Sequence, residues 1–368
     1  AEDGAQVDKA LAQKAELPNL QKIVVIDGKA SADGLVMTLT ELKTLGQQYA
    51  EQNPRAFDAT AQAVKADQLA TLIYTSGTTG KPKGVELTHD CWVFEGEGVA
   101  DLGCLVLEDH QYLWLPLAHS FGKVLEVAQL TIGFATTVDG RIPKLVDNLA
   151  IVKPTFMAAA PRIFEKVYNK VVVGAESAGG LKLKIFNWAM GVGREVSLLK
   201  QKGVEPSGLL SIKNRVADKL VFSKLRQRFG GQIRFFISGS APLSREIAEF
   251  FHAAGILILE GYGLTESSAA SFVNRPNAYK LGSVGQPVKG VELKISPEDG
   301  EILLHGRGIM RGYHGLAEAT TEALTADGWL RTGLGGLFNS AGLTHIGTPT
   351  DDEVPEYRRP GNPHEHFG

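Results

Sequence analysis

The chain has 368 residues, 43% hydrophobic and 21% charged, which is the composition of a globular protein with two domains or one large one. Its 38 basic and 41 acidic side chains give a formal net charge of −3, so the balance provides no reason to expect nucleic acid as a partner. Two cysteines, Cys91 and Cys104, cannot form a disulfide framework and favour reduced thiols in the cytoplasm. No apolar run approaches the roughly 20 residues that a membrane-spanning helix needs.

Short runs of β-branched and apolar residues predict strands along most of the chain. These runs lie at 22–27, 70–75, 111–115, 155–159, 232–237 and 256–260. Helical spacing separates them, for example in 244–255, where Ile247 and Phe250 share one face, Ser244 is placed as N-cap and Gly255 as stop. This alternation predicts an α/β fold with mixed, mainly parallel sheets and flanking helices.

Three later segments depart from this alternation. Residues 161–231 contain no convincing strand and predict a helical insertion. After Glu292 the runs become short and are separated by turn residues, which favours antiparallel strands. From Leu334 the chain loses its periodicity and becomes rich in proline, so residues 334–368 are expected to be poorly ordered.

The segment 74–85, "YTSGTTGKPKGV", raises a chemical question because it is made of small residues that can bury almost nothing. Such residues let backbone N–H groups approach phosphate oxygens, while hydroxyls add donors and Lys81 and Lys83 add positive charge. The segment is not a Walker loop, because Pro82 follows Gly80-Lys81 where that motif requires Ser or Thr. The alternative reading is an ordinary turn.

The whole string resembles the phosphate-loop motif of the adenylate-forming superfamily, which includes acyl-CoA synthetases, peptide-synthetase adenylation domains and luciferases. The resemblance implies that Lys81 and Lys83 act on the phosphates of ATP. It also implies a set of phosphate-binding residues, namely Thr75, Ser76, Gly77, Thr78, Thr79 and Gly80.

Further segments follow in the order that this superfamily shows. "LPLAHSF" at 115–121 looks like the segment that brings His119 near the acyl and phosphate site. "SGSAPL" at 238–243 resembles the loop that lines the adenine and acyl pocket with Gly239, Ser240 and Ala241. Taken alone, His119 is more often a structural histidine that is hydrogen-bonded in the fold.

"GYGLTES" at 261–267 is similar to the core nucleotide motif of the superfamily. The resemblance implies that Gly261, Tyr262 and Gly263 contact the adenine, with the tyrosine stacked on the base. It implies that Thr265 contacts the α-phosphate and that Glu266 binds Mg²⁺, a hard cation that prefers carboxylate oxygen. Taken alone, Tyr262 could belong to the core and Glu266 could be a solvated carboxylate at a helix start.

The insertion at 161–231 is similar to that of the long-chain fatty acyl-CoA synthetases. That branch implies a reaction in two steps, in which a fatty acid and ATP form acyl-adenylate and pyrophosphate, and coenzyme A then displaces AMP. Fatty acid, ATP, Mg²⁺ and coenzyme A are the implied partners. Peripheral membrane contact is expected for an enzyme of insoluble acids, although no basic amphipathic helix stands out in the sequence.

One departure from the family pattern concerns ribose binding. Members carry an aspartate after "RTG" that binds the ribose hydroxyls, and here Leu334 follows Gly333. We therefore expect residues 1–333 to be a partial adenylation domain with a non-family tail, lacking the family's C-terminal domain. The hypothesis is a long-chain fatty acid–CoA ligase with impaired adenylation. The alternatives are a non-catalytic nucleotide or acyl binder, and a ligase for another carboxylic acid.

Overall fold

A computed structural model of the chain describes residues 1–75, 81–339 and 342–347. Contacts divide the chain into two compact units, Ala1–Lys65 and Ala66–Gly368. The sequence predicted one domain over 1–333, whereas the first 65 residues form a unit of their own around a small separate core. That core consists of four buried side chains, namely Val7, Ile23, Val25 and Val36.

The first unit contains three α-helices and a two-stranded parallel sheet, and α1 and α2 pack against the sheet. Its elements are α1 (Gly4–Ala12), η1 (Lys14–Glu16), β1 (Ile23–Val25), β2 (Val36–Thr38), α2 (Leu39–Gln52) and α3 (Ala56–Ala63). A capping box starts α2: the Glu41 backbone N–H donates to the Thr38 hydroxyl at 3.2 Å, and the Thr38 N–H donates to the Glu41 carboxylate at 2.7 Å.

The second unit is built on a seven-stranded sheet in the order β11-β10-β9-β8-β7-β5-β6. Five of its strands are parallel, namely β5 (His110–Leu113), β6 (Ala135–Val138), β7 (Phe156–Ala159), β8 (Phe235–Ser238) and β9 (Ile258–Tyr262). Two short antiparallel strands, β10 (Phe272–Val273) and β11 (Gln286–Pro287), complete it. The predicted mainly parallel sheet is confirmed.

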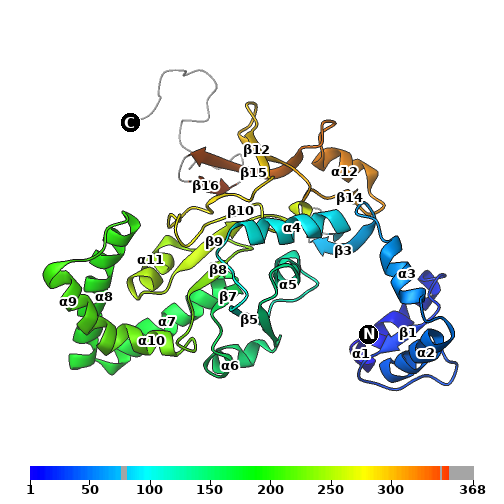
Figure 1. Cartoon of the computed structure of the whole chain (residues 1–368), viewed down its shortest axis with the longest axis horizontal. Helices are drawn as coiled ribbons and strands as arrows, with labels where there is room; N and C mark the ends of the chain where they lie inside the picture. Colours follow the sequence, from blue (N-terminus) through cyan, green and yellow to red (C-terminus); the bar gives the residue numbers. More distant parts are fainter. Residues whose placement is uncertain (76–80, 340–341, 348–368) are drawn as a thin grey trace. The chain divides into compact units, whose positions relative to one another are not determined.

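Helices cover both faces of this sheet because successive strand residues point to opposite sides. Phe156 and Phe235 pack in one cluster with α5, whereas Met157 and Phe236 pack in another with α6, α7, α8 and α11 (Figure 1). The covering helices are α4 (His89–Asp101), α5 (Ser120–Ile132), α6 (Leu145–Val152), α7 (Pro161–Ala178), α8 (Gly180–Gln201) and α11 (Arg245–Ala253). Because both faces are buried there, the central strands β7 and β8 are almost continuously apolar.

The predicted insertion is a series of helices between Pro161 and Gln227, interrupted at 202–207, and contains no strand. Besides α7 and α8 it comprises α9 (Gly208–Ala217), the π-helical turn η3 (Asp218–Phe222) and α10 (Ser223–Gln227). Helix α11 ends as predicted before Gly255, whose φ of 72° favours glycine, but the Ser244 side chain forms no capping hydrogen bond. Within the described residues no helix is long and apolar enough to cross a membrane.

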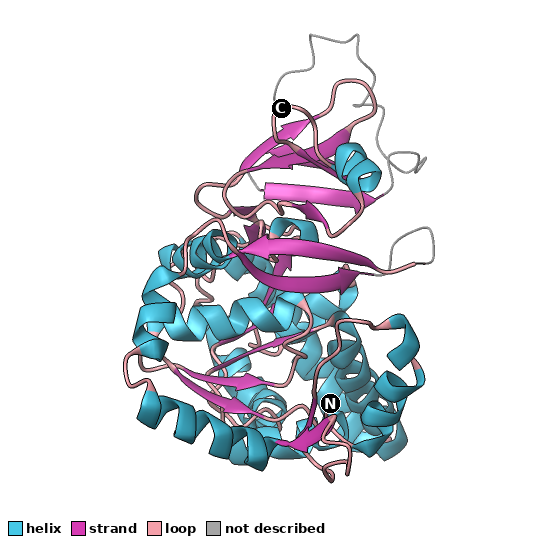
Figure 2. Ribbon diagram, turned by 90° about the vertical axis from the view of Figure 1, so that its right-hand side faces the viewer, coloured by secondary structure: helices cyan, strands magenta, loops and turns pink. Residues whose placement is uncertain are grey.

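The second unit also contains two antiparallel sheets (Figure 2). The first joins β3 (Leu69–Thr75), β4 (Lys83–Thr88) and β14 (Gly312–Tyr313), and the second joins β12 (Glu292–Ile295), β13 (Glu301–His305), β15 (Leu330–Asn339) and β16 (Gly342–Gly347). The strand predicted at 70–75 is therefore present, but it pairs with β4, which the sequence analysis missed. The seven residues between β3 and β4 are too few for a crossover to a parallel strand. The remaining short elements are η2 (Ile142–Lys144), η4 (Thr265–Ser267) and α12 (Ala317–Ala323).

Part of the expected tail is regular. β15 continues to Asn339 and pairs antiparallel with β16, so strands occupy 334–339 and 342–347 where the sequence predicted poor order. Strand β13 offers backbone donors and acceptors along its edge, so chain without hydrophobic periodicity can still extend that sheet. The rest of the predicted tail, 340–341 and 348–368, lies outside the described residues.

A half-buried ion pair links the amino ends of three parallel strands. Asp109 precedes β5, its side chain is only 2% exposed, and it accepts hydrogen bonds from Arg234, which precedes β8. Thr155, which precedes β7, donates its hydroxyl to Asp109 Oδ1 at 2.5 Å. A buried carboxylate is stable only when it is paired and hydrogen-bonded in this way. Because these contacts align the amino ends of β5, β7 and β8, they also position the carboxyl ends of the same strands relative to one another.

The buried His252 predicts a pH dependence of stability. Its Nδ1 lies 2.6 Å from Ser197 Oγ and its Nε2 lies 2.6 Å from the Tyr279 hydroxyl. Burial, followed by the charge of Lys200, lowers the pKa of His252. The unfolded chain, with an ordinary histidine pKa of about 6.5, then binds the proton more readily than the folded chain. The free energy of unfolding should therefore fall as the pH drops through about 6.5.

Thermal unfolding of wild type and His252→Gln at about pH 8 and about pH 5 checks this expectation. Between these two pH values the melting temperature of the wild type should fall further than that of the variant. Glutamine can form hydrogen bonds in place of the histidine but does not titrate. Equal losses in the two proteins would contradict it.

Candidate active site

Three of the segments singled out in the sequence follow parallel strands of the main sheet. Residues 115–121 come after β5, 238–243 begin at the end of β8, and 261–267 begin at the end of β9. Because the carboxyl ends of parallel strands meet at one edge of a sheet, these segments are brought together there. The β3–β4 hairpin opens at the same place.

One cavity of about 630 Å³ joins these segments. The predicted residues on its wall are Thr75, Lys83, His119, Gly239, Ser240, Gly261, Tyr262, Gly263, Thr265 and Glu266. Thr75 and Lys83 are paired in the register of β3 and β4, so both ends of the glycine-rich loop start from this wall. Residues 76–80 lie outside the described residues, and Lys81 is exposed and not part of the wall.

Tyr313 links the basic and acidic sides of this cavity. Lys83 Nζ lies 4.9 Å from the centroid of the Tyr313 ring, and the Tyr313 hydroxyl donates to Glu266 Oε1 at 2.8 Å. Burial raises the pKa of Tyr313, and the Glu266 carboxylate adds to the shift, so the phenol stays a donor. Tyr313 closes β14, which only tertiary pairing with β4 brings here, and no sequence signal assigned it a role.

The predicted His119 caps the amino end of α5. Its Nδ1 accepts from the Phe121 backbone N–H at 3.2 Å, so the neutral ring carries its proton on Nε2. Next to it, Ser120 Oγ lies 3.4 Å from Thr265 Oγ1, and both side chains are buried. His119 is exposed on the cavity wall and can therefore reach a ligand.

Packing leaves little room for a side chain at two glycines of the site. A Cβ on Gly263 would lie 1.5 Å from the Ala269 carbonyl oxygen, and one on Gly239 would lie 3.2 Å from the Phe121 ring. Ser240, between the two predicted loop residues, has a φ of 69°, a conformation that is strained for a side chain. Close backbone approach therefore builds this wall of the cavity.

Glu95 of α4 supports the segment that follows the GYGLTES motif. Its carboxylate is 1% exposed and accepts from the Ala270 backbone N–H at 3.2 Å and 3.3 Å. Burial raises the pKa of Glu95 well above its usual range, which favours the neutral acid. The sequence analysis missed this residue, since nothing in the spacing of α4 marks a buried carboxyl.

A second cavity of about 460 Å³ adjoins the first and shares Ser240, Gly261, Tyr262 and Gly263 with it. Its wall also contains Ala241, a predicted site residue, and Leu334. It further contains Glu260, which the sequence analysis did not single out. Burial raises the pKa of Glu260 to about 7, while the Gly282 N–H, which donates to its Oε1 at 3.2 Å, opposes the shift.

The donor set for a metal ion is small. Among the described residues no three His, Cys, Asp or Glu side chains converge on one point. Glu266 alone presents a carboxylate on the cavity wall beside Lys83 and Thr265. Magnesium in nucleotide sites is usually held by one or two carboxylates together with phosphate oxygens and water. This single carboxylate fits an ion that arrives with a nucleotide.

Most of the remaining lining of the first cavity is hydrocarbon. We call this part the apolar arm, and it is lined by Val99, Leu102, Leu105, Val124, Leu125, Ala128, Phe235, Ile237, Leu259, Phe272 and Val273. These side chains come from α4 and the loop after it, from α5, and from strands β8, β9 and β10. One continuous cavity therefore joins a polar end made of the predicted motifs to an apolar end.

The sequence profile of the AMP-binding enzymes matches residues 2–314. The chain belongs to this family. FadD15, the long-chain-fatty-acid–CoA ligase of Mycobacterium tuberculosis, is 37% identical over 354 residues, covering 93% of this chain and 56% of that protein. The ligase ACSBG2 of Xenopus laevis is 34% identical and covers 94% of this chain and 48% of its own length. This member of the AMP-binding family spans about half the length of the curated relatives it matches.

Solved structures of two other proteins share the fold. ATP-bound MatB from Rhodopseudomonas palustris matches with a TM-score of 0.57 and 24% identity, covering 78% of this chain and 49% of that one. The o-succinylbenzoate CoA synthetase of Bacillus subtilis, in complex with its acyl-adenylate intermediate, matches with a TM-score of 0.55 and 22% identity over 77% of this chain and 49% of that one. The fold class predicted from the sequence is confirmed.

Gly263→Ala should damage the site. The added methyl group would overlap the Ala269 carbonyl, and forcing it in should cost about 2 to 3 kcal/mol or displace the segment. Chemical denaturation measures the loss. Gly191→Ala is the matched control, because Gly191 is exposed within α8 and nothing lies within 4 Å of an added Cβ. Gly191→Ala should raise the free energy of unfolding by up to about 1 kcal/mol. Equal effects of the two changes would contradict the close approach at Gly263.

Proposed function

We propose that this chain is the nucleotide- and acyl-binding part of a long-chain fatty acid–CoA ligase. One observation carries the proposal: a single cavity joins the nucleotide motifs at one end to the apolar arm at the other. A substrate with one anionic end and one hydrocarbon end matches such a cavity. Its volume of about 630 Å³ is within the usual range for ligand pockets. The names of the similar ligases support the same substrate class.

In this proposal the carboxylate of the acid attacks the α-phosphate of ATP and pyrophosphate leaves, after which coenzyme A thiolate displaces AMP. Catalysis of the first step requires donors and cations around oxygens on which negative charge builds up. Lys83, Lys81 and the hydroxyls of Thr75 and Thr265 provide them. His119 can donate from Nε2. Magnesium, held by Glu266 and the phosphates, would neutralise part of the charge when it is bound.

The second cavity is the proposed place for the nucleoside. Tyr262 and Ala241 would face the base, and Glu260, with a pKa of about 7, can accept or donate a hydrogen bond there. Leu334 lies on the same wall, at the position where the superfamily pattern has a ribose-binding aspartate. A leucine cannot accept hydrogen bonds from ribose hydroxyls. We therefore propose that nucleotide binding and adenylation are impaired in this chain.

Leu334→Asp tests both the site and the impairment. Restoring an acceptor for two hydroxyls should tighten ATP binding by roughly tenfold or more. Calorimetry with ATP and Mg²⁺ on the full chain measures the affinity, and pyrophosphate release with palmitate measures turnover. Leu334→Asn is the control, with the same shape and no charge.

The same measurements separate the alternatives. Micromolar ATP affinity without pyrophosphate release in wild type and Leu334→Asp favours a non-catalytic nucleotide binder. Unchanged affinity in Leu334→Asp would contradict the placement of the ribose. Rapid pyrophosphate release by the wild type would contradict the impairment, and release with a short or aromatic acid in preference to palmitate would favour a ligase for another acid.

Ala128→Phe tests the apolar arm. Ala128 is fully buried on the cavity wall, so a phenyl ring there should fill the arm. Palmitate binding, followed by displacement of a fluorescent fatty acid, should weaken by roughly tenfold while octanoate binding changes little. Val93→Phe is the control, because Val93 is on α4 but 51% exposed. Equal losses for both acids, or none, would contradict the assignment of the arm.

A further inference from the structure

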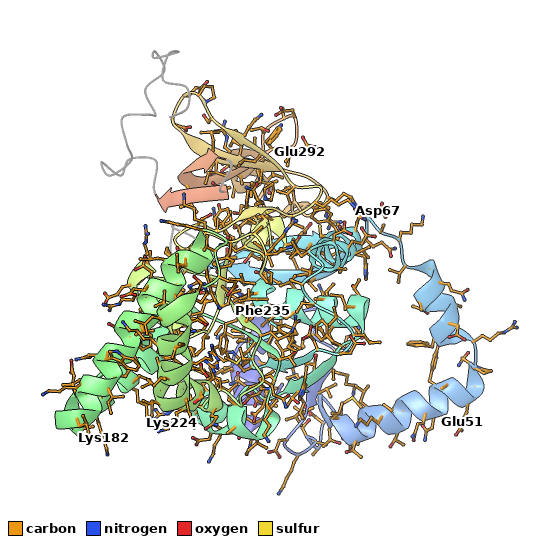
Figure 3. All side chains as sticks on the ribbon, turned by 60° about the vertical axis from the view of Figure 1, so that its left-hand side comes forward. Glu51, Asp67, Lys182, Lys224, Phe235 and Glu292 are labelled. Atoms are coloured by element: carbon orange, nitrogen blue, oxygen red, sulfur yellow. The ribbon has the colours of Figure 1, made fainter. Side chains whose placement is uncertain are left out.

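The helical insertion carries a charge that the rest of the chain does not share. Residues 161–231 contain 14 Lys and Arg against 5 Asp and Glu, a net charge of +9 in a chain whose total is −3. The remainder is therefore strongly acidic. In Figure 1 the helices α8, α9 and α10 of this insertion gather together, and Figure 3 labels Lys182 and Lys224 among them. So uneven a distribution indicates a surface for an anionic partner.

Within the insertion, α9, η3 and α10 form one continuous helical segment with two apolar sides. One side is buried in the main core through Ala217, Phe222 and Leu225. The other side faces solvent. It consists of the exposed stripe, defined as Leu209, Ile212, Val216 and Leu220, which are 67%, 54%, 45% and 42% exposed.

The spacing of the exposed stripe is three or four residues at every step, so its members lie along one face of the helix. Within the described residues these side chains stay open to solvent. Scattered single apolar residues on a surface need no explanation, but four aligned on one face do. The stripe therefore has the geometry of a docking face.

Basic residues flank the exposed stripe. Lys213, Lys219 and Lys224 are all exposed and alternate with it along the same helical segment, and Arg215 and Arg228 add to them. The only acidic residue of the segment, Asp218, is paired with Arg226 at 2.6 Å. An apolar face bordered by lysine and arginine on a surface helix is the arrangement that lies in the interface of a lipid bilayer.

We propose that this face docks the protein on an anionic lipid bilayer, with the exposed stripe inserted at the level of the headgroups and the lysines on the lipid phosphates. The combination of stripe and charge decides against the other partners. A nucleic acid would need the charge but no hydrocarbon, and a second copy of the chain docked through the same face would bring +9 against +9. The inference stands independently of the proposed function, because it concerns a surface outside the cavity.

Vesicle co-sedimentation of the full chain tests the proposal. The protein should partition onto vesicles of equal parts phosphatidylcholine and phosphatidylglycerol and much less onto phosphatidylcholine alone. Raising the ionic strength from about 0.01 M to about 1 M shortens the screening length from about 30 Å to about 3 Å and should weaken binding strongly. Nothing in this readout depends on ATP or turnover.

Two variants separate the contribution of the lysine charges to vesicle binding from that of the exposed stripe. Lys213→Glu/Lys219→Glu/Lys224→Glu should lower the partition coefficient by roughly a hundredfold. Ile212→Gln/Val216→Gln keeps the charge and suits a helix, and it should lower partitioning by roughly tenfold. The matched control is Lys29→Glu/Lys43→Glu/Lys280→Glu, which makes the same change of charge at exposed positions outside the insertion and should retain most of the binding.

Several outcomes would overturn the proposal. Equal binding to neutral and anionic vesicles would do so, as would equal losses in the control and the lysine variant. If the Gln variant binds as wild type and duplex DNA displaces the protein from vesicles, the surface is a nucleic-acid site. If the wild type self-associates and the Gln variant is monomeric, the stripe is an interface between copies of the chain.

Discussion

The site depends on the common edge at which parallel strands β5, β8 and β9 end. Each strand continues into a segment that carries chemistry, and the register between strands determines how near these segments come to each other. The half-buried Asp109–Arg234 pair lies at the opposite edge, where β5 and β8 begin, so displacement of one strand would leave the buried Asp109 carboxylate without its partner. The cavity is therefore positioned by groups at the other end of the sheet.

The charged and acidic side chains near the two cavities lie in two different environments. At the phosphate end, Lys83 and Glu266 remain on an accessible wall with the Tyr313 phenol between them, so a ligand with negative oxygens and a cation can replace water there. At the buried positions, Glu95 and Glu260, the low dielectric favours the neutral acid.

Two different faces of the protein are apolar, for different reasons. The apolar arm lies between α4, α5 and the sheet, away from water, and suits a hydrocarbon chain. The exposed stripe on α9 and η3 stays in water beside lysines. In the proposed arrangement a single protein takes an insoluble acid into one apolar region while resting on the bilayer with the other. The basic amphipathic segment escaped the sequence analysis because its second side is also apolar and buried, which obscures the periodicity.

The sequence by itself determined the α/β class, the helical insertion and the motifs, since hydrophobic period and short strings of small residues are local properties. It also singled out Leu334, which the fold then placed on a cavity wall. Tertiary structure alone decided the pairing of β3 with β4, the separate first unit and the hairpin of β15 and β16. It alone brought Tyr313 to Glu266 across 47 residues and enclosed Glu95 and Glu260. Such features depend on which backbone edges and side chains meet in space, and no local pattern encodes that.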